Sequence, residues 1–211
     1  MTSDAPAGLR ERKRERTRRE LQTAAIRLMS EQGFATTTIE QIAEAADVSA
    51  RTFFRYFPTK EAVVLTDLQD DAVARYLAEA SDDLDIIDTY TAAITSAFDA
   101  LDDEQWRAEQ KRMQLVITSP ELGAISILPR AMRPVRDAAD FIARRLGVPD
   151  DDFRPRLYAS QLIAASAAAA APLLQRMATG DVDRDEILTA VRTGLAALRE
   201  PFPSGIRTPP A

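Results

Sequence analysis

The sequence contains no cysteine and no histidine, and only 7 of its 211 residues are glycine. The absence of cysteine excludes disulfides, iron–sulfur ligation and thiol catalysis. The absence of histidine removes the commonest general base and the commonest metal ligand, so neither a Ser-His-Asp triad nor a histidine-ligated zinc centre is possible. The sequence also has no glycine-rich phosphate loop and no calcium-loop spacing. We therefore expect a protein that is not an enzyme and that needs no cofactor or metal.

Long apolar runs are also missing. The first 30 residues hold no continuous apolar stretch of the kind found in a secretory signal peptide. The most apolar stretch, residues 163–174, is shorter than a bilayer span and contains Ser166 and Pro172. We therefore expect a cytoplasmic protein with no membrane-crossing segment.

The alternative of an enzyme rests on two acidic clusters. Without histidine or cysteine, such a centre would have to hold Mg²⁺ or Ca²⁺ through oxygen ligands alone. The carboxylates on offer are Asp82, Asp83, Asp85 and Asp88, and then Asp102, Asp103 and Glu104. Acidic residues at helix junctions usually serve as helix caps, and this is the role that we expect here.

Positive charge is scarce overall but concentrated at one end of the chain. The net charge is −6, yet residues 1–60 carry +3 and residues 61–211 carry −9. The segment Arg10–Arg19 alone has seven basic and two acidic side chains. Such a segment suits a polyanion, because each phosphate that it neutralises releases a counterion. A solvated, charged N-terminus is the alternative that charge alone leaves open.

Helical periodicity runs through the sequence, whereas the alternation typical of strands is nearly absent. It predicts an all-α protein of about nine or ten helices. The predicted helices span about 16–32, 38–46, 49–56, 59–80, 85–101, 104–118 and 121–127, then one that reaches about 146 after breaks at Pro129 and Pro134, one over 152–178 interrupted by Pro172, and a last one that opens at Asp183.

Local signals define the second and third helices closely. Thr38 and Gln41 form a Thr-x-x-Gln capping box at the start of the second helix. Asp47 tolerates left-handed backbone and marks a tight turn after it. The third helix follows from about Ser49 and is stopped by Pro58. Three helices with a short turn between the last two are typical of a helix-turn-helix unit.

The third helix has two distinct faces. Phe53 and Phe57 are four residues apart and are expected to face the core, which turns Arg51 and Arg55 outward, with Thr52 and Tyr56 in the next row. Arginine can bond guanine O6 and N7 together, and threonine can contact a thymine methyl or a phosphate. A plain three-helix packing unit with a solvated arginine face is the alternative that spacing leaves open.

The run TTTIEQIAEAADVSARTFFRYFPTKEAVV, residues 36–64, resembles the DNA-binding segment of the TetR family of bacterial transcription regulators. The matching features, over about residues 14–64, are a threonine-rich start, Ile42-Ala43, Ala46, Val48-Ser49, Phe53-Phe54, Tyr56-Phe57, Pro58 and Lys60-Glu61. Asp47 stands where the family usually has glycine, and Arg51 where a small residue is more usual, which indicates a different operator sequence. The RTFFRYF form is similar to an actinobacterial branch that includes mycofactocin-type regulators.

The resemblance implies a role for each matching residue. Ala50, Arg51 and Thr52 would meet bases, with Phe54 against a thymine methyl. Thr38, Tyr56 and Lys60 would hold phosphates, and arginines of the basic segment would reach the flanking minor groove. The complete predicted DNA-binding set is Thr38, Ser49, Ala50, Arg51, Thr52, Phe54, Arg55, Tyr56, Lys60, Arg14, Arg16 and Arg18.

The resemblance also implies a domain plan and a function. It predicts a disordered basic arm (1–14), a helix-turn-helix DNA-binding domain (15–58), a larger C-terminal helical domain for ligand binding and dimerisation (59–200) and a disordered tail (201–211). The expected protein is a homodimeric repressor that binds a palindromic operator in double-stranded DNA and is released by a small hydrophobic effector. A sequence-tolerant architectural DNA-binding protein is the alternative, and ordinary protein core is the alternative for both C-terminal residue sets below.

Two residue sets in the C-terminal region carry the expectations for dimer and ligand. The predicted dimer interface consists of Tyr158, Leu162, Ala165, Ala169, Leu173, Ile187, Val191, Leu195 and Leu198, with Gly194 permitting close helix approach. The predicted ligand pocket is lined by Leu68, Ile94, Phe98, Trp106, Met113, Ile117 and Phe141. Arg130, Arg133 and Arg136 form a basic run that suits an anionic ligand head group. A solvent-facing position near the helix breaks is the alternative for these arginines.

Overall fold

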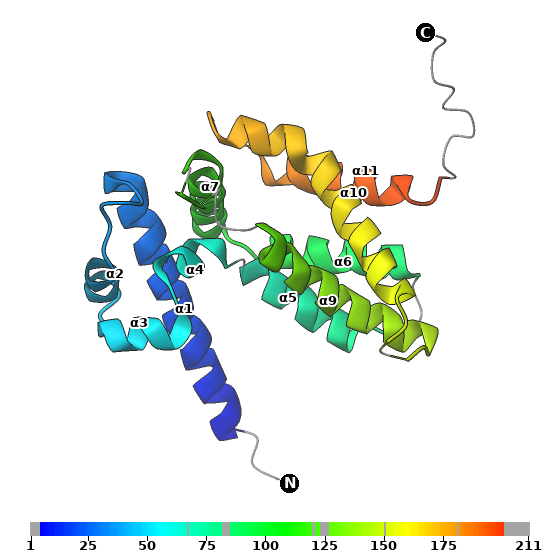
Figure 1. Cartoon of the computed structure of the whole chain (residues 1–211), viewed down its shortest axis with the longest axis horizontal. Coiled ribbons are helices and arrows are strands. Elements are labelled where there is room, and N and C mark those ends of the chain that lie inside the picture. Colours follow the sequence, from blue (N-terminus) through cyan, green and yellow to red (C-terminus); the bar gives the residue numbers. More distant parts are fainter. Residues whose placement is uncertain are drawn as a thin grey trace. The chain divides into compact units, whose positions relative to one another are not determined.

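The structure of the chain is a computed structural model. It describes residues 5–66, 68–81, 85–119, 121–122, 127–149, 151–180 and 182–200, with the side chains of 5–11, 68 and 127–132 left out. Every regular element in these residues is a helix, which confirms the predicted all-α fold (Figure 1). The helices are α1 (Ala5–Gln32), α2 (Ile39–Ala45), α3 (Ala50–Tyr56), α4 (Lys60–Leu65), α5 (Leu68–Glu79), α6 (Ile86–Asp99), α7 (Asp103–Thr118), α9 (Ile127–Leu146), α10 (Arg154–Met177) and α11 (Arg184–Ala197).

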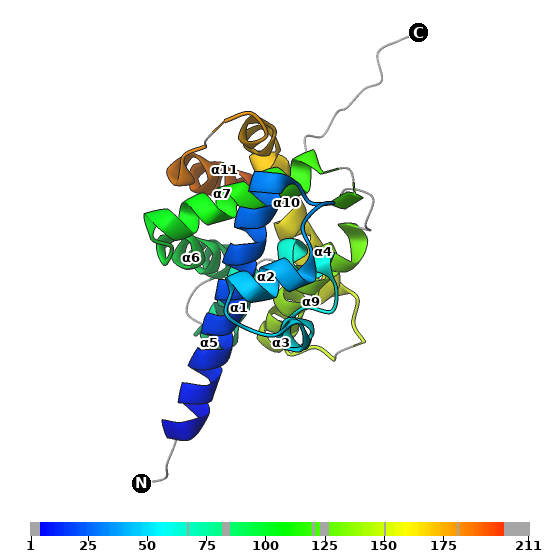
Figure 2. The same cartoon turned by 90° about the vertical axis from the view of Figure 1, so that its left-hand side faces the viewer.

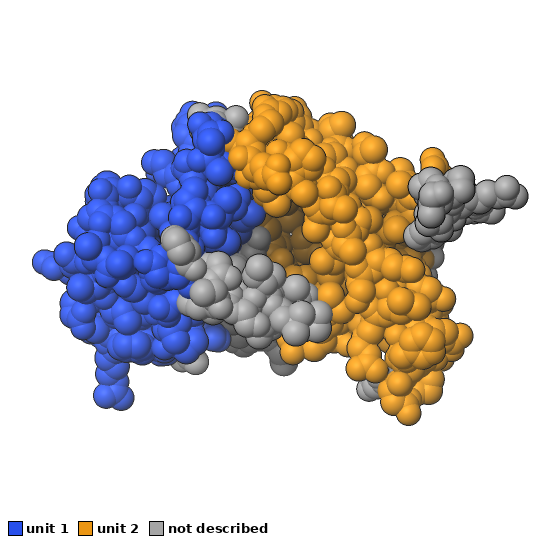
Figure 3. Space-filling model, turned by 45° about the horizontal axis from the view of Figure 1, so that its top comes forward, with its two compact units in different colours: residues 1–68, 101–130, 177–181 blue, residues 69–100, 131–176, 182–211 orange. Residues whose placement is uncertain are grey.

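The chain divides into two compact units, which Figure 3 colours separately. The first consists of residues 1–68, 101–130 and 177–181, and the second of residues 69–100, 131–176 and 182–211. The first unit therefore combines the N-terminal helices with α7. The predicted tail and most of the helix predicted at 121–127 lie outside the described residues, and the predicted domain boundaries remain predictions.

The core of the first unit is built around α1, which packs against α2, α4 and α7. The predicted apolar stripe of this helix is buried at Leu21, Ala25 and Met29. Phe53 of α3 and Val63 of α4 join the same core with no exposed surface. Burying each large apolar side chain contributes about 1.5–3 kcal/mol to the stability of the folded state. This cluster therefore fixes the short helices α2 to α4 on the long helix α1.

Helix α1 begins at Ala5 rather than near Arg16, and it takes in the basic segment. Arginine, lysine and glutamate are good helix formers, and Arg16 pairs with Glu20 one turn later at 3.0 Å. The N-terminal turns of α1 extend past α3 in two perpendicular views (Figures 1 and 2). The basic residues are therefore carried on a helix.

The single helix expected over 59–80 is wrong, because the structure has two helices there, α4 and α5. Thr66, which follows α4, has extended backbone. The side-chain amide of Gln22 donates hydrogen bonds to the carbonyl oxygens of Val63, at 2.9 Å, and Thr66, at 2.7 Å. The Val63 carbonyl would otherwise accept the next bond of a continuing helix, so this contact from α1 ends α4.

The break expected at Pro134 and the interruption expected at Pro172 are also wrong. Helix α9 runs through Pro134, and α10 runs through Pro172. Proline removes one backbone hydrogen bond, and in α9 the burial of Val135, Ala138 and Phe141 directly after it offsets this loss.

In the second unit α6 packs against α11, and α11 also crosses α10 closely. A Cβ added at Gly194 would lie 2.5 Å from the carbonyl oxygen of Ala165 and 2.7 Å from the Cβ of Ala169. Gly194 therefore permits close helix approach, as predicted, but the helix that approaches is α10 of the same chain.

Candidate nucleic-acid interface

The turn between α2 and α3 has the geometry that the sequence predicts. The hydroxyl of Thr38 accepts a hydrogen bond from the backbone N–H of Gln41, whose side chain accepts one from the backbone N–H of Thr38. This confirms the capping box. Asp47 has a φ of 52° in the left-handed region, and Ser49 caps α3 by accepting from the N–H of Thr52. These local contacts set where each helix of the motif begins.

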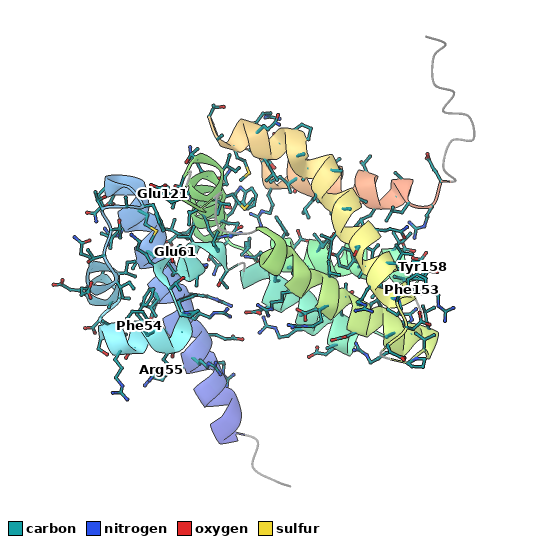
Figure 4. All side chains as sticks on the ribbon, in the orientation of Figure 1. Phe54, Arg55, Glu61, Glu121, Phe153 and Tyr158 are labelled. Atoms are coloured by element: carbon teal, nitrogen blue, oxygen red, sulfur yellow. The ribbon has the colours of Figure 1, made fainter. Side chains whose placement is uncertain are left out.

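Helix α3 is fixed by its aromatic inner face. Phe53 and Phe57 are 0% and 1% exposed, and their ring centroids are 5.8 Å apart. The opposite face is open to solvent: Arg51 and Arg55 are exposed, and so is 53% of the surface of Phe54. Figure 4 labels Phe54 and Arg55 on this helix. A helix with its inner face locked and its outer face bearing arginine and an exposed aromatic ring has the shape and chemistry of a base-reading helix.

The smaller predicted contact residues lie around this outer face. Thr38 and Ser49 are exposed, and the Thr38 hydroxyl, which accepts a capping bond, retains its own hydrogen for a phosphate oxygen. Thr52 is half-buried, with its hydroxyl 3.1 Å from that of Ser49. Tyr56 is half-buried beneath the guanidinium of Arg55, which lies 5.1 Å from its ring centroid. Ala50 is half-buried at the first position of α3.

Lys60 is placed differently from the expectation of a phosphate ligand. Its ammonium donates hydrogen bonds to the backbone carbonyl oxygens of Phe34 and Thr37, at 2.8 and 3.0 Å. It also lies 4.4 Å from the centroid of the Phe34 ring. The residue is half-buried and serves the loop between α1 and α2. Sequence reasoning missed this contact because the two segments are more than 20 residues apart.

The predicted arginines of the basic segment have different surroundings. Arg14 and Arg16 are exposed, and Arg16 pairs with Glu20. Arg18 is half-buried, with its guanidinium 5.8 Å from the ring centroid of Phe57. Arg18 therefore packs on the end of α3, whereas Arg14 and Arg16 remain on the surface.

The predicted pocket residues divide between the two units. In the first unit Trp106 is buried, Met113 is half-buried and Ile117 is 42% exposed. In the second unit Ile94 and Phe98 are half-buried and Phe141 is buried. The side chain of Leu68 lies outside the described residues. The pocket therefore remains a prediction.

The predicted basic run is partly neutralised. Arg133 pairs with Asp71 and, at 3.6 Å, with Asp137. Burial alone would lower the pKa of Arg133, but its hydrogen bond and attraction to Asp71 raise the pKa overall. Arg136 is 70% exposed, and Arg130 lies outside the described side chains.

The predicted dimer residues separate into buried and exposed groups. Leu162, Ile187, Val191 and Leu195 are buried within the second unit, so they have almost no surface left to bury against a partner. Ala165 and Ala169 lie against Gly194, and Leu173 is half-buried. Tyr158 and Leu198 remain exposed, at 39% and 37%.

Two exposed apolar residues beside Tyr158 were not predicted. Phe153 is 65% exposed and Leu157 is 44% exposed, both near the start of α10. Figure 4 labels Phe153 beside Tyr158. The sequence signal for them is weak, because isolated exposed apolar residues are normal on protein surfaces.

One residue of each acidic cluster is a helix cap, and the other described members, Asp88, Asp103 and Glu104, lie in the first turn of the capped helix. Asp85 caps α6 and Asp102 caps α7, each by accepting a backbone N–H three residues later at 2.8 Å. That bond from Asp88 and the guanidinium of Arg199 lower the pKa of Asp85 to about 2. Asp82 and Asp83 lie outside the described residues. Within the described part of the chain, no group of three or more acidic side chains is placed to hold a metal.

The apolar run at 163–174 lies within the longer helix α10. By length and composition this is the one helix in the described residues that could span a membrane. Helices at protein cores and interfaces have the same composition, so this property alone does not place the chain in a membrane.

Comparison with known proteins agrees with this geometry. Residues 21–66 match the family model described as bacterial regulatory proteins of the tetR family, and residues 84–203 match the MftR C-terminal domain. The HTH-type transcriptional regulator TcmR of Streptomyces glaucescens is 33% identical over 97% of this chain and 92% of its own length. The mycofactocin biosynthesis transcriptional regulator MftR of Mycobacterium tuberculosis is 33% identical over 70% of this chain and 75% of its own.

A solved structure has the same fold. FadR of Thermus thermophilus, a TetR family transcriptional repressor in complex with lauroyl-CoA, matches with a TM-score of 0.51 and 22% identity over 92% of this chain and 98% of its own. The residues that match the family model include Asp47 and Arg51, where the sequence departs from the usual family residues. The chain therefore belongs to the TetR family of bacterial transcription regulators, with an N-terminal helix-turn-helix domain and an MftR-type C-terminal domain.

Proposed function

We propose that the protein is a cytoplasmic repressor that binds a palindromic operator as a homodimer and is released by a small apolar ligand. The observation that carries the proposal is the outer face of α3, where Arg51, Phe54 and Arg55 are exposed above a buried aromatic core. Arginine reads guanine in the major groove, and an apolar side chain contacts the thymine methyl. Arg51 and Arg55 are one turn apart, so they address neighbouring bases.

We expect residues around the outer face of α3 to contact DNA phosphates. The Thr38 hydroxyl is exposed at the start of α2, where a phosphate oxygen can accept its hydrogen. Arg14 and Arg16 are on α1, and a helix about 10–12 Å across does not enter a minor groove about 6 Å wide. We therefore expect these two arginines to contact flanking phosphates, with their side chains alone reaching the groove edge.

The dimer is supported by the free side of α10. Phe153, Leu157 and Tyr158 are exposed at its start, and Ala164 and Ala168 continue the exposed side over the next turns. Burying such a surface against a second copy removes apolar area from water. A two-fold dimer would place two α3 helices in half-sites about 34–36 Å apart, which is the reason for a palindromic operator.

The release by ligand is supported by the contacts of α4. This helix directly follows α3, and Gln22 of α1 and Arg112 of α7 hold its C-terminal carbonyls. A ligand that shifts α7 would therefore shift α4 and the motif attached to it. Ligand and operator would then favour different conformations and weaken each other's binding equally. The lauroyl-CoA bound to the related FadR supports a ligand with an acyl chain.

The test is in vitro selection of random duplex DNA on the purified protein, on Arg51→Ala and on Arg107→Ala. Arg107 is an exposed arginine of α7 and controls for loss of charge. The wild type and Arg107→Ala should enrich the same inverted repeat. Arg51→Ala should relax the preference at one position of each half-site and lose about 1–3 kcal/mol of binding there.

Other outcomes separate the alternatives. Binding without any enriched sequence would favour the architectural DNA-binding protein. A single half-site instead of an inverted repeat would contradict the dimer, and absence of any binding would contradict the proposal as a whole.

A further inference from the structure

The ammonium of Lys60 is surrounded by backbone carbonyl oxygens of the loop between α1 and α2. It bonds the carbonyl oxygens of Phe34 at 2.8 Å and Thr37 at 3.0 Å, with that of Ala35 at 3.4 Å. Its nitrogen also faces the Phe34 ring at 4.4 Å. An ammonium has three donors and no acceptor, so three carbonyls and an aromatic face satisfy it completely.

The position of Lys60 in its own helix makes these contacts necessary. It is the first residue of α4, after the N-cap Thr59. A positive charge in the first turn of a helix is opposed by the helix dipole. The carbonyl oxygens of the loop between α1 and α2 supply the negative partial charge that compensates for it.

The loop that Lys60 holds determines where α2 begins. Phe34 and Thr37 are 8% and 1% exposed, so their carbonyls are fixed by buried residues. The Thr37 hydroxyl donates to the carbonyl of Gly33 at 2.8 Å, and Gly33 has a φ of 93° that turns the chain out of α1. Thr38, the N-cap of α2, follows directly. A change in this loop therefore changes the position of the first turn of α2.

We propose that Lys60 is a positioning residue, an internal clamp that fixes the start of α2 against the start of α4, and that it does not bind a DNA phosphate. The inference rests on the proposed function in one respect, since the element that it positions belongs to the DNA interface. Loss of the clamp weakens binding to every sequence, because it misplaces α2 and not because a phosphate contact is lost.

Lysine labelling of the wild-type protein tests the clamp without DNA and without any variant. The chain has three lysines, Lys13, Lys60 and Lys111, and the other two are exposed. With an amine-reactive acetylating reagent and mass spectrometry, Lys60 should react at least about tenfold more slowly than Lys111, because the clamp must open first. Adding operator or random duplex DNA should not slow Lys60 further. Equal reactivity in the free protein, or protection of Lys60 only by DNA, would overturn the proposal.

The salt dependence of binding tests what Lys60 does on DNA. Lys60→Met removes the ammonium and keeps an unbranched side chain that is one atom shorter, and Lys111→Met is the matched loss of one lysine on α7. At a temperature where circular dichroism shows Lys60→Met folded, its affinity should fall about tenfold. The slope of log K against log salt should equal that of Lys111→Met. A slope for Lys60→Met that is smaller than that for Lys111→Met by about 0.9, which is the value of one phosphate contact, would overturn the proposal. An unchanged affinity of Lys60→Met would also overturn it. If Lys60→Met does not fold, the lysine labelling of the wild-type protein decides whether the clamp exists. If neither the wild type nor any variant binds DNA, the proposed function fails, but the labelling result for the clamp still stands.

Discussion

The guanidinium of Arg112, on α7, donates a hydrogen bond to the backbone carbonyl oxygen of Val64, 3.1 Å away in α4. Arg112 is 1% exposed, and it pairs with Glu109 through a bond of 2.8 Å from its Nε. The pair is local to α7, but the bond to Val64 joins α7 to the helix that follows the DNA-reading motif. A buried charge in this position makes the junction sensitive to substitution.

Arg112→Met should lower the free energy of unfolding by about 3–5 kcal/mol, because it removes the buried guanidinium from the half-buried Glu109 carboxylate and from the Val64 carbonyl oxygen. Urea unfolding followed by circular dichroism measures the loss. Arg107→Met, on the exposed face of the same helix, should change stability by no more than about 0.5 kcal/mol. Replacing both partners, as Arg112→Met with Glu109→Leu, should recover part of the loss. A double variant as unstable as the single one would contradict this account of the pair.

Asp47 holds a left-handed backbone at the turn of the motif, with a φ of 52°. Glycine adopts this conformation without strain, aspartate tolerates it, and alanine does so least well. Asp47→Gly should raise the free energy of unfolding by about 0.5 kcal/mol, and Asp47→Ala should lower it by about 1 kcal/mol. Thermal unfolding of the three proteins checks the order. An alanine variant at least as stable as the aspartate would show that the turn is not strained.

The predictability of the motif and of its surroundings differs for a physical reason. The start of α2, the turn at Asp47 and the start of α3 depend on contacts within four residues, and sequence patterns record such contacts. The end of α4 depends on Gln22, which is more than 40 residues away, and the role of Lys60 depends on carbonyls of a distant loop. Backbone carbonyls carry no sequence signal, so neither contact could be found from the residue pattern.

The same distinction applies to the C-terminal helices. Their apolar stripes were predicted from periodicity, but periodicity does not distinguish a face that packs within the chain from one that packs on a second copy. Ile187 and Leu195 are buried within the chain, whereas Leu157, on the free side of α10, is exposed. Only the packing of α11 against α6 and α10 shows which apolar residues are buried within the chain and which are left exposed.

Gly194 allows α10 and α11 to cross closely, and Gly194→Ala should lower the free energy of unfolding by about 1–2 kcal/mol. The added Cβ would lie 2.5 Å from the Ala165 carbonyl oxygen, and a backbone atom cannot rotate away. This cost exceeds the gain of about 1 kcal/mol that alanine brings to a helix. Gly180→Ala is the control, because an added Cβ there meets nothing within 4 Å. Equal thermal midpoints for the two variants would contradict the close crossing.

The proposed dimer depends on the free side of α10, where Ala168 is exposed. Ala168→Arg should separate the copies, because a charged side chain would be buried in the centre of the apolar contact without a partner. Light scattering after gel filtration should show the mass fall from twice 23.3 kDa to 23.3 kDa. Ala100→Arg, the same change at the exposed C-cap of α6, should leave the dimer intact. A dimer that survives Ala168→Arg would place the interface elsewhere.

Asp85 should give the second unit a stability contribution that depends on pH. The backbone N–H of Asp88 and the guanidinium of Arg199, 2.6 Å away, lower its pKa from 3.8 to about 2. A carboxyl with a lowered pKa in the folded state stabilises the protein above the unfolded value, and the contribution is lost as the pH falls through the folded value.

Asp85→Asn keeps a good helix cap and removes the charge. Because the group is largely exposed, the wild type should exceed this variant by no more than about 1 kcal/mol at pH 6. The difference should begin to decline below about pH 4 and be nearly gone at pH 2. Urea unfolding of both proteins at these pH values measures it, and Arg199→Met should reduce the same pH dependence. A difference that is unchanged at pH 2 would show that the charge of Asp85 does not produce it.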